Sequence, residues 1–105
     1  MERLQSNEYV DDFIESLDEL TSAKVVRMLN ILKEKGSLIG MPYSKKIESH
    51  IFELRIHGEQ AVRIFYTFHD GRIILLHAFK KKSDKIPLRE LETARSRYIT
   101  LTVIA

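Results

Sequence analysis

The stretch from Ile51 to Lys82, IFELRIHGEQAVRIFYTFHDGRIILLHAFKKK, decides the fold of this chain. It contains three strand-like runs, at residues 51–57, 62–68 and 73–81, and each of the two short links between them contains a glycine. Successive side chains of a strand point to opposite faces, so the first two runs have one apolar face and one face that carries arginine. Short links with glycine are typical of hairpins, and the Asp-Gly pair in the second link is the stronger signal. The stretch therefore predicts an antiparallel meander of three strands.

The third run is apolar on both faces, which indicates a strand that is covered above and below. Strict alternation places Leu76 on the face of Phe52 and Val62, and places Phe79 and Lys81 on the opposite face, together with the arginines of the first two runs. The run ends in three consecutive lysines. A basic surface mounted on a sheet is suited to holding phosphate.

Two amphipathic helices are predicted before the meander. Between residues 7 and 20, apolar side chains recur at the spacing i, i+3, i+4 and i+7, and Asn7 is a plausible N-cap. Thr21 or Ser22 is expected to cap a second helix, which stops at Gly36. The apolar stripes of this helical hairpin need a cover, and the apolar face of the meander supplies one.

The remaining segments are an irregular connection and a closing helix. Residues 37–48 contain breakers of regular structure and are expected to be a loop, in which Lys45 and Lys46 are candidates for contact with a nucleic-acid backbone. Pro87 suits the first position of a helix that runs to about residue 99. The β-branched, apolar residues 100–105 are expected to pair at a sheet edge. The expected class is α+β, with the helical hairpin packed on a small antiparallel meander and a C-terminal helix.

Composition limits the class of protein. A chain of 105 residues is expected to form one domain over 1–105, and 44% hydrophobic with 30% charged residues is ordinary for a soluble protein. The absence of cysteine excludes disulfides and thiolate metal sites. No segment has the length of a membrane span, and the N-terminus lacks the apolar core of a signal peptide. A cytoplasmic protein is expected.

Charge is distributed unevenly along the chain. Residues 1–43 contain five Lys/Arg and eight Asp/Glu, a net charge of −3, whereas residues 44–105 contain twelve and seven, a net charge of +5. The positive charge therefore belongs to the predicted sheet and the closing helix. A basic half of this kind indicates a polyanionic partner.

Four motifs carry a resemblance to a known family: GMPY at 40–43, FELR at 52–55, VRIFY at 62–66 and LLHAFKKKS at 75–83. In this order, and followed by a closing helix, they resemble the RelE/ParE superfamily of bacterial toxins, and within it the phage-derived HigB-like branch. The resemblance covers roughly residues 8–99 and implies a RelE-like fold. Members of the superfamily usually begin with a strand. Residues 1–6 are short and polar, so this strand is expected to be missing, or its edge to be taken by the apolar tail.

The resemblance implies a toxin of a type II toxin–antitoxin system, namely a ribosome-dependent endoribonuclease that cleaves messenger RNA. It also implies silencing by a helix-turn-helix antitoxin of the HigA type, and no cofactor. Cleavage without a metal proceeds by attack of the 2′-hydroxyl on the adjacent phosphate, which requires cations around the phosphate and groups that move protons. The candidate catalytic residues are Arg55, Arg63, Lys81 and Lys82. The candidate RNA-binding residues are Lys45, Lys46, Phe65, Phe79 and Lys80.

Each assignment has an alternative. Arg55 and Arg63 can pair with Glu53 as a cross-strand charge cluster, and the three lysines can be a solvated strand end. His77 is expected to be a packed residue more than a general base. The histidines lack the spacing of metal ligands. At the level of function, a ParE-like inhibitor of DNA gyrase and a non-catalytic phage-derived remnant that only binds remain open.

Overall fold

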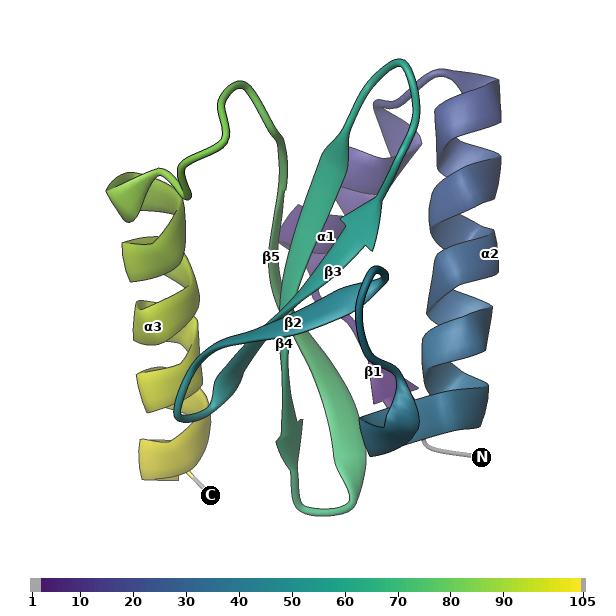
Figure 1. The fold of residues 1–105 in the computed structure, drawn as a ribbon. Helices are drawn as coiled ribbons and strands as arrows, with labels where there is room; N and C mark the ends of the chain where they lie inside the picture. The colour runs from purple at the N-terminus through teal and green to yellow at the C-terminus, as the bar shows by residue number, and fades with distance from the viewer. Residues whose placement is uncertain (1–2, 105) are drawn as a thin grey trace.

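The computed structural model describes residues 3–104, in which three α-helices and a short 3-10 helix accompany one five-stranded sheet (Figure 1). The strand order across the sheet is β1-β5-β4-β3-β2. Strands β2 to β5 pair with one another in antiparallel fashion, which confirms the predicted meander and the α+β class. Along the chain the elements are β1 (Arg3–Gln5), α1 (Glu8–Glu15), α2 (Glu19–Lys35), η1 (Gly36–Leu38), β2 (Ser44–Glu48), β3 (Ile51–Ile56), β4 (Val62–His69), β5 (Arg72–Lys80) and α3 (Leu88–Ile104).

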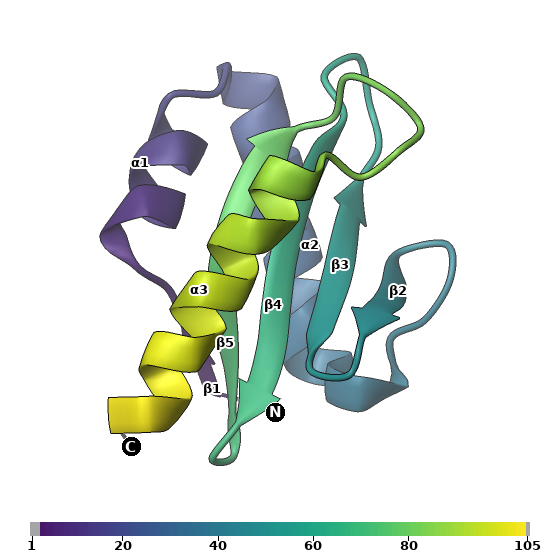
Figure 2. The same ribbon diagram turned by 90° about the vertical axis from the view of Figure 1, so that its left-hand side faces the viewer.

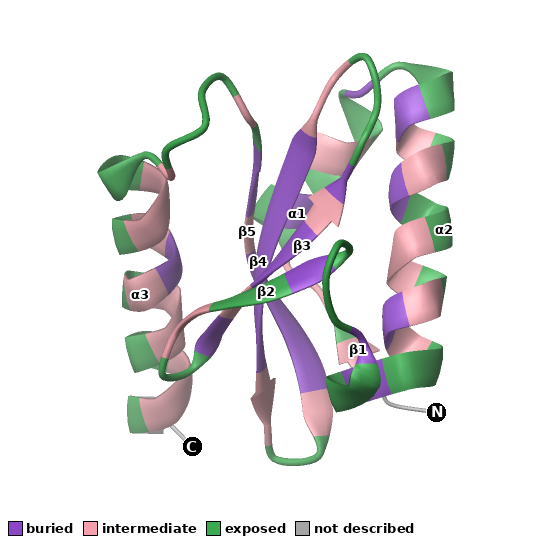
Figure 3. Ribbon diagram, viewed as in Figure 1, coloured by how far each residue is buried: buried purple, intermediate pink, exposed green. Residues whose placement is uncertain are grey.

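Helices cover both faces of the sheet. The α1–α2 hairpin packs on one face and α3 lies on the other, as the two views of the ribbon show (Figures 1 and 2). Each interface is a separate apolar cluster: Val25, Leu32 and Ile64 belong to the first, and Phe65 and Ala94 belong to the second. Buried residues therefore concentrate in the sheet, which is the middle layer (Figure 3).

The prediction that the first strand is missing, or replaced by the tail, is wrong. Residues Arg3 to Gln5 form β1, which pairs in parallel with β5, and Leu4 packs against the core. Residues 100–104 instead complete α3, because Leu101 packs on the sheet within the same helix. Tertiary packing here overrides the strand preference of β-branched residues. The first strand is short and polar because it needs only one inward side chain at a sheet edge.

The connection predicted as a loop contains a fifth strand. Ser44 to Glu48 form β2, which pairs with β3 and has an irregularity between Lys46 and Glu48. The buried Ser44 hydroxyl forms a hydrogen bond with the hydroxyl of Tyr66, whose pKa is raised by burial. This bond satisfies two polar groups that would otherwise be costly inside the core.

Helix caps and turns follow the sequence with one exception. Asn7 Oδ1 accepts a hydrogen bond from the Val10 amide at 2.9 Å and so caps α1, as predicted. Asp18, and not Thr21 or Ser22, caps α2. The backbone and side-chain hydrogen bonds from Thr21 lower the pKa of Asp18. Gly36 ends α2 with a φ of 53°.

A bulge changes the faces of β5. Phe65 pairs with His77 and Tyr66 pairs with Leu75, so Leu76 has no partner on β4. The extra residue shifts the alternation by one position. Leu76 therefore packs with Phe65 under α3, and its predicted placement with Phe52 and Val62 is wrong. Beyond the bulge the alternation resumes, so Phe79 still lies on the α3 side.

Asn7 also fastens α1 to the sheet, because its side-chain amide donates to the carbonyl of Leu75 at 3.1 Å. We expect Asn7→Ala to lower the free energy of unfolding by roughly 1–2 kcal/mol, since it removes an N-cap and a partly buried hydrogen bond. Asn7→Ser keeps a cap acceptor without the amide donor and should lose about half as much. Urea unfolding of the three proteins measures this. Equal losses for both variants would show that the cap contributes nothing.

A basic cleft as candidate active site

The strand register brings the two predicted arginines side by side. Arg55 on β3 lies opposite Arg63 on β4, and Arg63 lies opposite Phe79 on β5. All three line a cleft of about 280 Å³ on the α3 side of the sheet, which is closed by residues 81–87. The β5 ladder continues for one more bond, from the Lys81 amide to the carbonyl of Ala61 at 2.9 Å. Lys81 therefore lines the same cleft, as the alternation predicts.

Glu53 lies between the two arginines. Its Oε1 accepts a hydrogen bond from Arg55 Nε at 2.9 Å, and its Oε2 lies 3.9 Å from Arg63 Nε. The side chains of Glu53 and Arg63 are only 4% and 7% exposed. The cross-strand charge cluster named as an alternative is therefore present. It leaves one carboxylate for two guanidinium groups, and so an excess of positive charge at the wall of the cleft.

Burial lowers the pKa of Arg63. Desolvation lowers the pKa of its guanidinium, Glu53 acts in the opposite sense, and Arg55 lowers the pKa further. An arginine starts so far above neutral pH that it stays charged. Arg63 also donates to the carbonyl of Val62 at 3.1 Å, which orients the group. The result is a fixed, desolvated cation of the kind that interacts strongly with an anion.

Two further lysines and one carboxylate complete the charge of the cleft. Lys45 enters from β2 and Lys85 from the loop after β5. Lys81 Nζ lies 3.5 Å from Asp84 Oδ1, whose residue is fully exposed, so this ion pair is weak. Five cationic side chains and two carboxylates thus face one cleft. Its lining can bind a phosphate group.

The structure places four predicted residues away from the cleft. Lys80 points to the other face of the sheet, where its charge adds to the Thr21 hydrogen bonds that lower the pKa of Asp18. Lys46 and Lys82 are exposed and do not line the cleft. Phe65 is fully buried and packs 5.2 Å from Phe79, ring centre to ring centre. With 0% of its surface exposed it offers no ring face to a base, and we do not include it in the proposed site.

Two residues that sequence reasoning undervalued do line the cleft. Lys85 is part of a loop, and only the path of that loop brings it back over the sheet. His57 ends the first run of the meander. It is two residues from Arg55, so alternation alone places it on the same face as that arginine. Within residues 3–104, no group of three histidine, cysteine or acidic side chains is arranged to hold a metal ion.

His77 lies between β5 and α3, outside the cleft. Its Nε2 is 3.2 Å from Glu90 Oε1, and its Nδ1 is 3.2 Å from a nitrogen of Arg97. Because a guanidinium only donates, Nδ1 is the acceptor and the proton of the neutral ring sits on Nε2, toward Glu90. Both ring nitrogens are thus engaged in holding α3 to the sheet.

The fold is RelE-like. The structure is similar to that of a mutant of the E. coli toxin RelE in the free state, with a TM-score of 0.69 and 12% sequence identity over 91% of this chain and 96% of that chain. A sequence family described as phage derived protein Gp49-like matches residues 12–99. The chain therefore belongs to the phage-derived Gp49-like family, and its assignment to the RelE superfamily from sequence motifs is confirmed. No curated protein matches the sequence.

Proposed function

We propose that this protein is the toxin of a type II toxin–antitoxin system and that it cleaves messenger RNA on the ribosome. One observation carries the proposal: Arg55, Arg63, Lys81 and Lys85 converge on a single cleft, and among the described residues that line it only Glu53 and Asp84 are acidic. The RelE-like fold and the Gp49-like family support the toxin class. A gyrase inhibitor of the ParE type acts by binding a protein, and such binding does not require several cationic side chains to converge on one cleft.

In the proposed reaction, the 2′-hydroxyl of one nucleotide attacks the adjacent phosphorus, and the 5′-oxygen of the next nucleotide leaves. The attacking hydroxyl loses a proton and the leaving oxygen gains one, and in this proposal side chains of the cleft, without a metal, move both protons. Arg63 and Arg55 stabilise the charge that builds up on the phosphoryl oxygens. Lys81, near the mouth of the cleft, is positioned to take part in proton transfer. Lys85 replaces Lys82 in the catalytic set that we propose.

The proposed partners follow from the proposed function. A helix-turn-helix antitoxin of the HigA type would hold the toxin silent, and the ribosome would present the message to the basic cleft. Action on translating ribosomes places the protein in the cytoplasm. Within residues 3–104, no helix is long and apolar enough to cross a membrane.

The experiment is induction of the chain in a bacterial host, followed by mapping of new 5′ ends on a translated reporter message. The same message without its start codon is the control. We expect growth arrest and new ends on the translated copy only, because the cleft is proposed to act on messages held by the ribosome. Growth arrest without new RNA ends would favour a gyrase-type inhibitor, and no growth arrest would favour a binding remnant.

A further inference from the structure

An exposed tyrosine lies beside the basic cleft. Tyr43 directly precedes β2, and the Arg55 amide donates to its carbonyl at 2.8 Å, so the β2–β3 ladder extends by one residue and places Tyr43 opposite Arg55. Opposed residues of an antiparallel pair lie on the same face of the sheet. The next residue, Ser44, is buried on the α1–α2 side, where it bonds to Tyr66. Alternation therefore places the Tyr43 ring on the α3 side, next to the part of the cleft wall that Arg55 forms.

The strand order keeps this ring uncovered. β2 is an edge strand, and α3 packs on β5 and β4, so the β3–β2 part of the face has no helix over it (Figure 2). Tyr43 is 46% exposed, whereas Phe79 and Phe65 on the same face are 6% and 0% exposed. A ring that a ligand can reach is thus present beside the cleft, one strand away from the buried rings.

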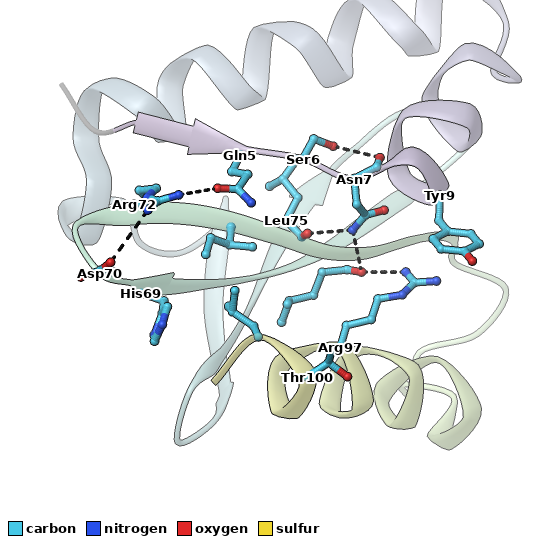
Figure 4. Close-up of a pocket in the computed structure, with 13 residues that line it drawn as sticks. Gln5, Ser6, Asn7, Tyr9, His69, Asp70, Arg72, Leu75, Arg97 and Thr100 are labelled. Atoms are coloured by element: carbon cyan, nitrogen blue, oxygen red, sulfur yellow. Dashed lines mark hydrogen bonds and ion pairs between the residues drawn. The ribbon is translucent and has the colours of Figure 1, made fainter. Parts of the chain in front are cut away.

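A second exposed tyrosine provides a contrast. Tyr9 of α1 is 70% exposed, but the guanidinium of Arg97 lies over its ring, 4.5 Å from the ring centre (Figure 4). Tyr9 belongs to a hollow beside β1 that shares no residue with the basic cleft. Exposure alone therefore does not distinguish the two tyrosines. What distinguishes Tyr43 is its position next to the arginines of the cleft.

The ring and the arginines form one row across the sheet. Tyr43 lies opposite Arg55, which in turn lies opposite Arg63. Neighbouring strands are about 4.8 Å apart, so the backbone of Tyr43 is roughly 5 Å from that of Arg55 and roughly 10 Å from that of Arg63. The base and the phosphate of a nucleotide lie on opposite sides of one sugar. A phosphate held by the two arginines therefore brings the attached base within reach of the Tyr43 ring.

The surroundings of Tyr43 favour a nucleotide over an apolar protein surface. Lys45 and Lys46 follow on β2 and are both exposed, and the guanidinium of Arg55 lies 3.9 Å from the sulfur of Met41. Unpaired RNA bases are held by stacking on aromatic rings, while cations hold the backbone. A ring bordered by this much positive charge meets both requirements.

We propose that Tyr43 is the stacking platform for a base next to the phosphate that is cleaved. The position of the cleaved bond rests on the proposed function, whereas the stacking itself requires only that the chain bind single-stranded RNA. Every base has a π face, so the ring contributes affinity and orientation and does not by itself select one base. Tyr43 thus takes the role that the sequence pattern assigned to Phe65.

The first measurement is cleavage of a message on programmed ribosomes by the purified full chain. We expect Tyr43→Ala to lower kcat/KM by about tenfold or more, the loss typical when one stack of a base on an aromatic ring is removed. Tyr43→Phe keeps the ring and should keep the activity. Tyr9→Ala removes an exposed tyrosine away from the cleft, so it is the matched control and should cleave like the wild type. Thermal melting of each variant checks that the fold is kept.

The second measurement detects the stack directly. A single-stranded 2′-O-methyl oligonucleotide lacks the attacking hydroxyl and is not cleaved, and 2-aminopurine placed in it loses fluorescence when it stacks on a ring. We expect quenching by the wild type, Tyr43→Phe and Tyr9→Ala, and little quenching by Tyr43→Ala. Equal quenching by Tyr43→Ala and the wild type would overturn the proposal, and so would absence of quenching by the wild type. An equal loss of activity in Tyr43→Phe would overturn it as well, because the hydroxyl and not the ring would then matter.

The stacking site and the nuclease fail in different ways. A chain that does not cleave RNA, but quenches 2-aminopurine through Tyr43, rejects the nuclease and supports the stacking site. Cleavage that is lost in Arg63→Ala but unchanged in Tyr43→Ala supports the nuclease and overturns the stacking site. If Tyr43→Ala cleaves at the full rate and binds the proposed antitoxin more weakly, this surface belongs to a protein partner, and the stacking site is again overturned.

Discussion

Arg63→Ala is expected to abolish growth arrest and to lower RNA cleavage by at least ~100-fold, the loss typical when a preorganised donor to a developing oxyanion is removed. Arg63 is the most deeply buried cation of the cleft, so its charge acts with little screening by solvent. The fold should remain, because Glu53 keeps its 2.9 Å bond to Arg55. Mapping of 5′ ends after induction, and melting of the purified variant, measure the two effects.

Lys80→Ala is the matched control for the charge lost. Lys80 belongs to the same lysine run as Lys81 but points to the α1–α2 side of the sheet, so its removal should leave cleavage unchanged. Lys81→Ala should reduce cleavage. An Arg63→Ala protein that is folded and still toxic would contradict the nuclease assignment. If Lys80→Ala and Lys81→Ala had equal effects on cleavage, Lys81 would have no role in the mechanism.

Glu53→Gln is expected to lower the free energy of unfolding by about 3 kcal/mol, the lower end of the range for breaking a buried ion pair. The carboxylate is the shared counter-charge of Arg55 and Arg63, and without it two neighbouring guanidinium groups repel each other. The loss stays at the lower end because the Arg55 side chain is 23% exposed and can turn toward water. Guanidinium chloride is itself a salt, so unfolding should be followed in urea.

The control for this change is Glu48→Gln. Glu48 also pairs with an arginine, at 2.8 Å from Arg95, but both side chains are solvated, and such pairs contribute little to stability. We therefore expect no measurable change. Similar losses for Glu48→Gln and Glu53→Gln would contradict the view that burial makes the Glu53 cluster important.

Much of the candidate site was predictable because it depends on local patterns. Period-two alternation in β3 and β4 is enough to place Arg55 and Arg63 on one face, opposite the α1–α2 hairpin. The Asp-Gly turn before β5 was equally readable, since Asp70 and Gly71 both have positive φ, at 54° and 72°, as a tight hairpin requires. These features need no knowledge of distant parts of the chain.

Other features depend on contacts that no local pattern contains. The bulge at Leu76 arises from the pairing of β5 with β4. The last residues of α3 are helical because Leu101 packs against the apolar cluster on the sheet. Phe65 looked available for stacking because alternation puts it on the basic face, yet α3 and Phe79 bury it. The sequence shows which face a side chain takes, but not what covers that face.

The sequence by itself determined the order of the elements, the helical hairpin over one sheet face, the arginine-bearing opposite face and the superfamily, because alternation, capping and turn chemistry act over a few residues. The tertiary structure alone decided that β1 pairs with β5 and that Lys85, and not Lys82, joins the cleft. These outcomes depend on which segments meet after the chain has folded. That choice is made by burial of apolar surface over the whole molecule.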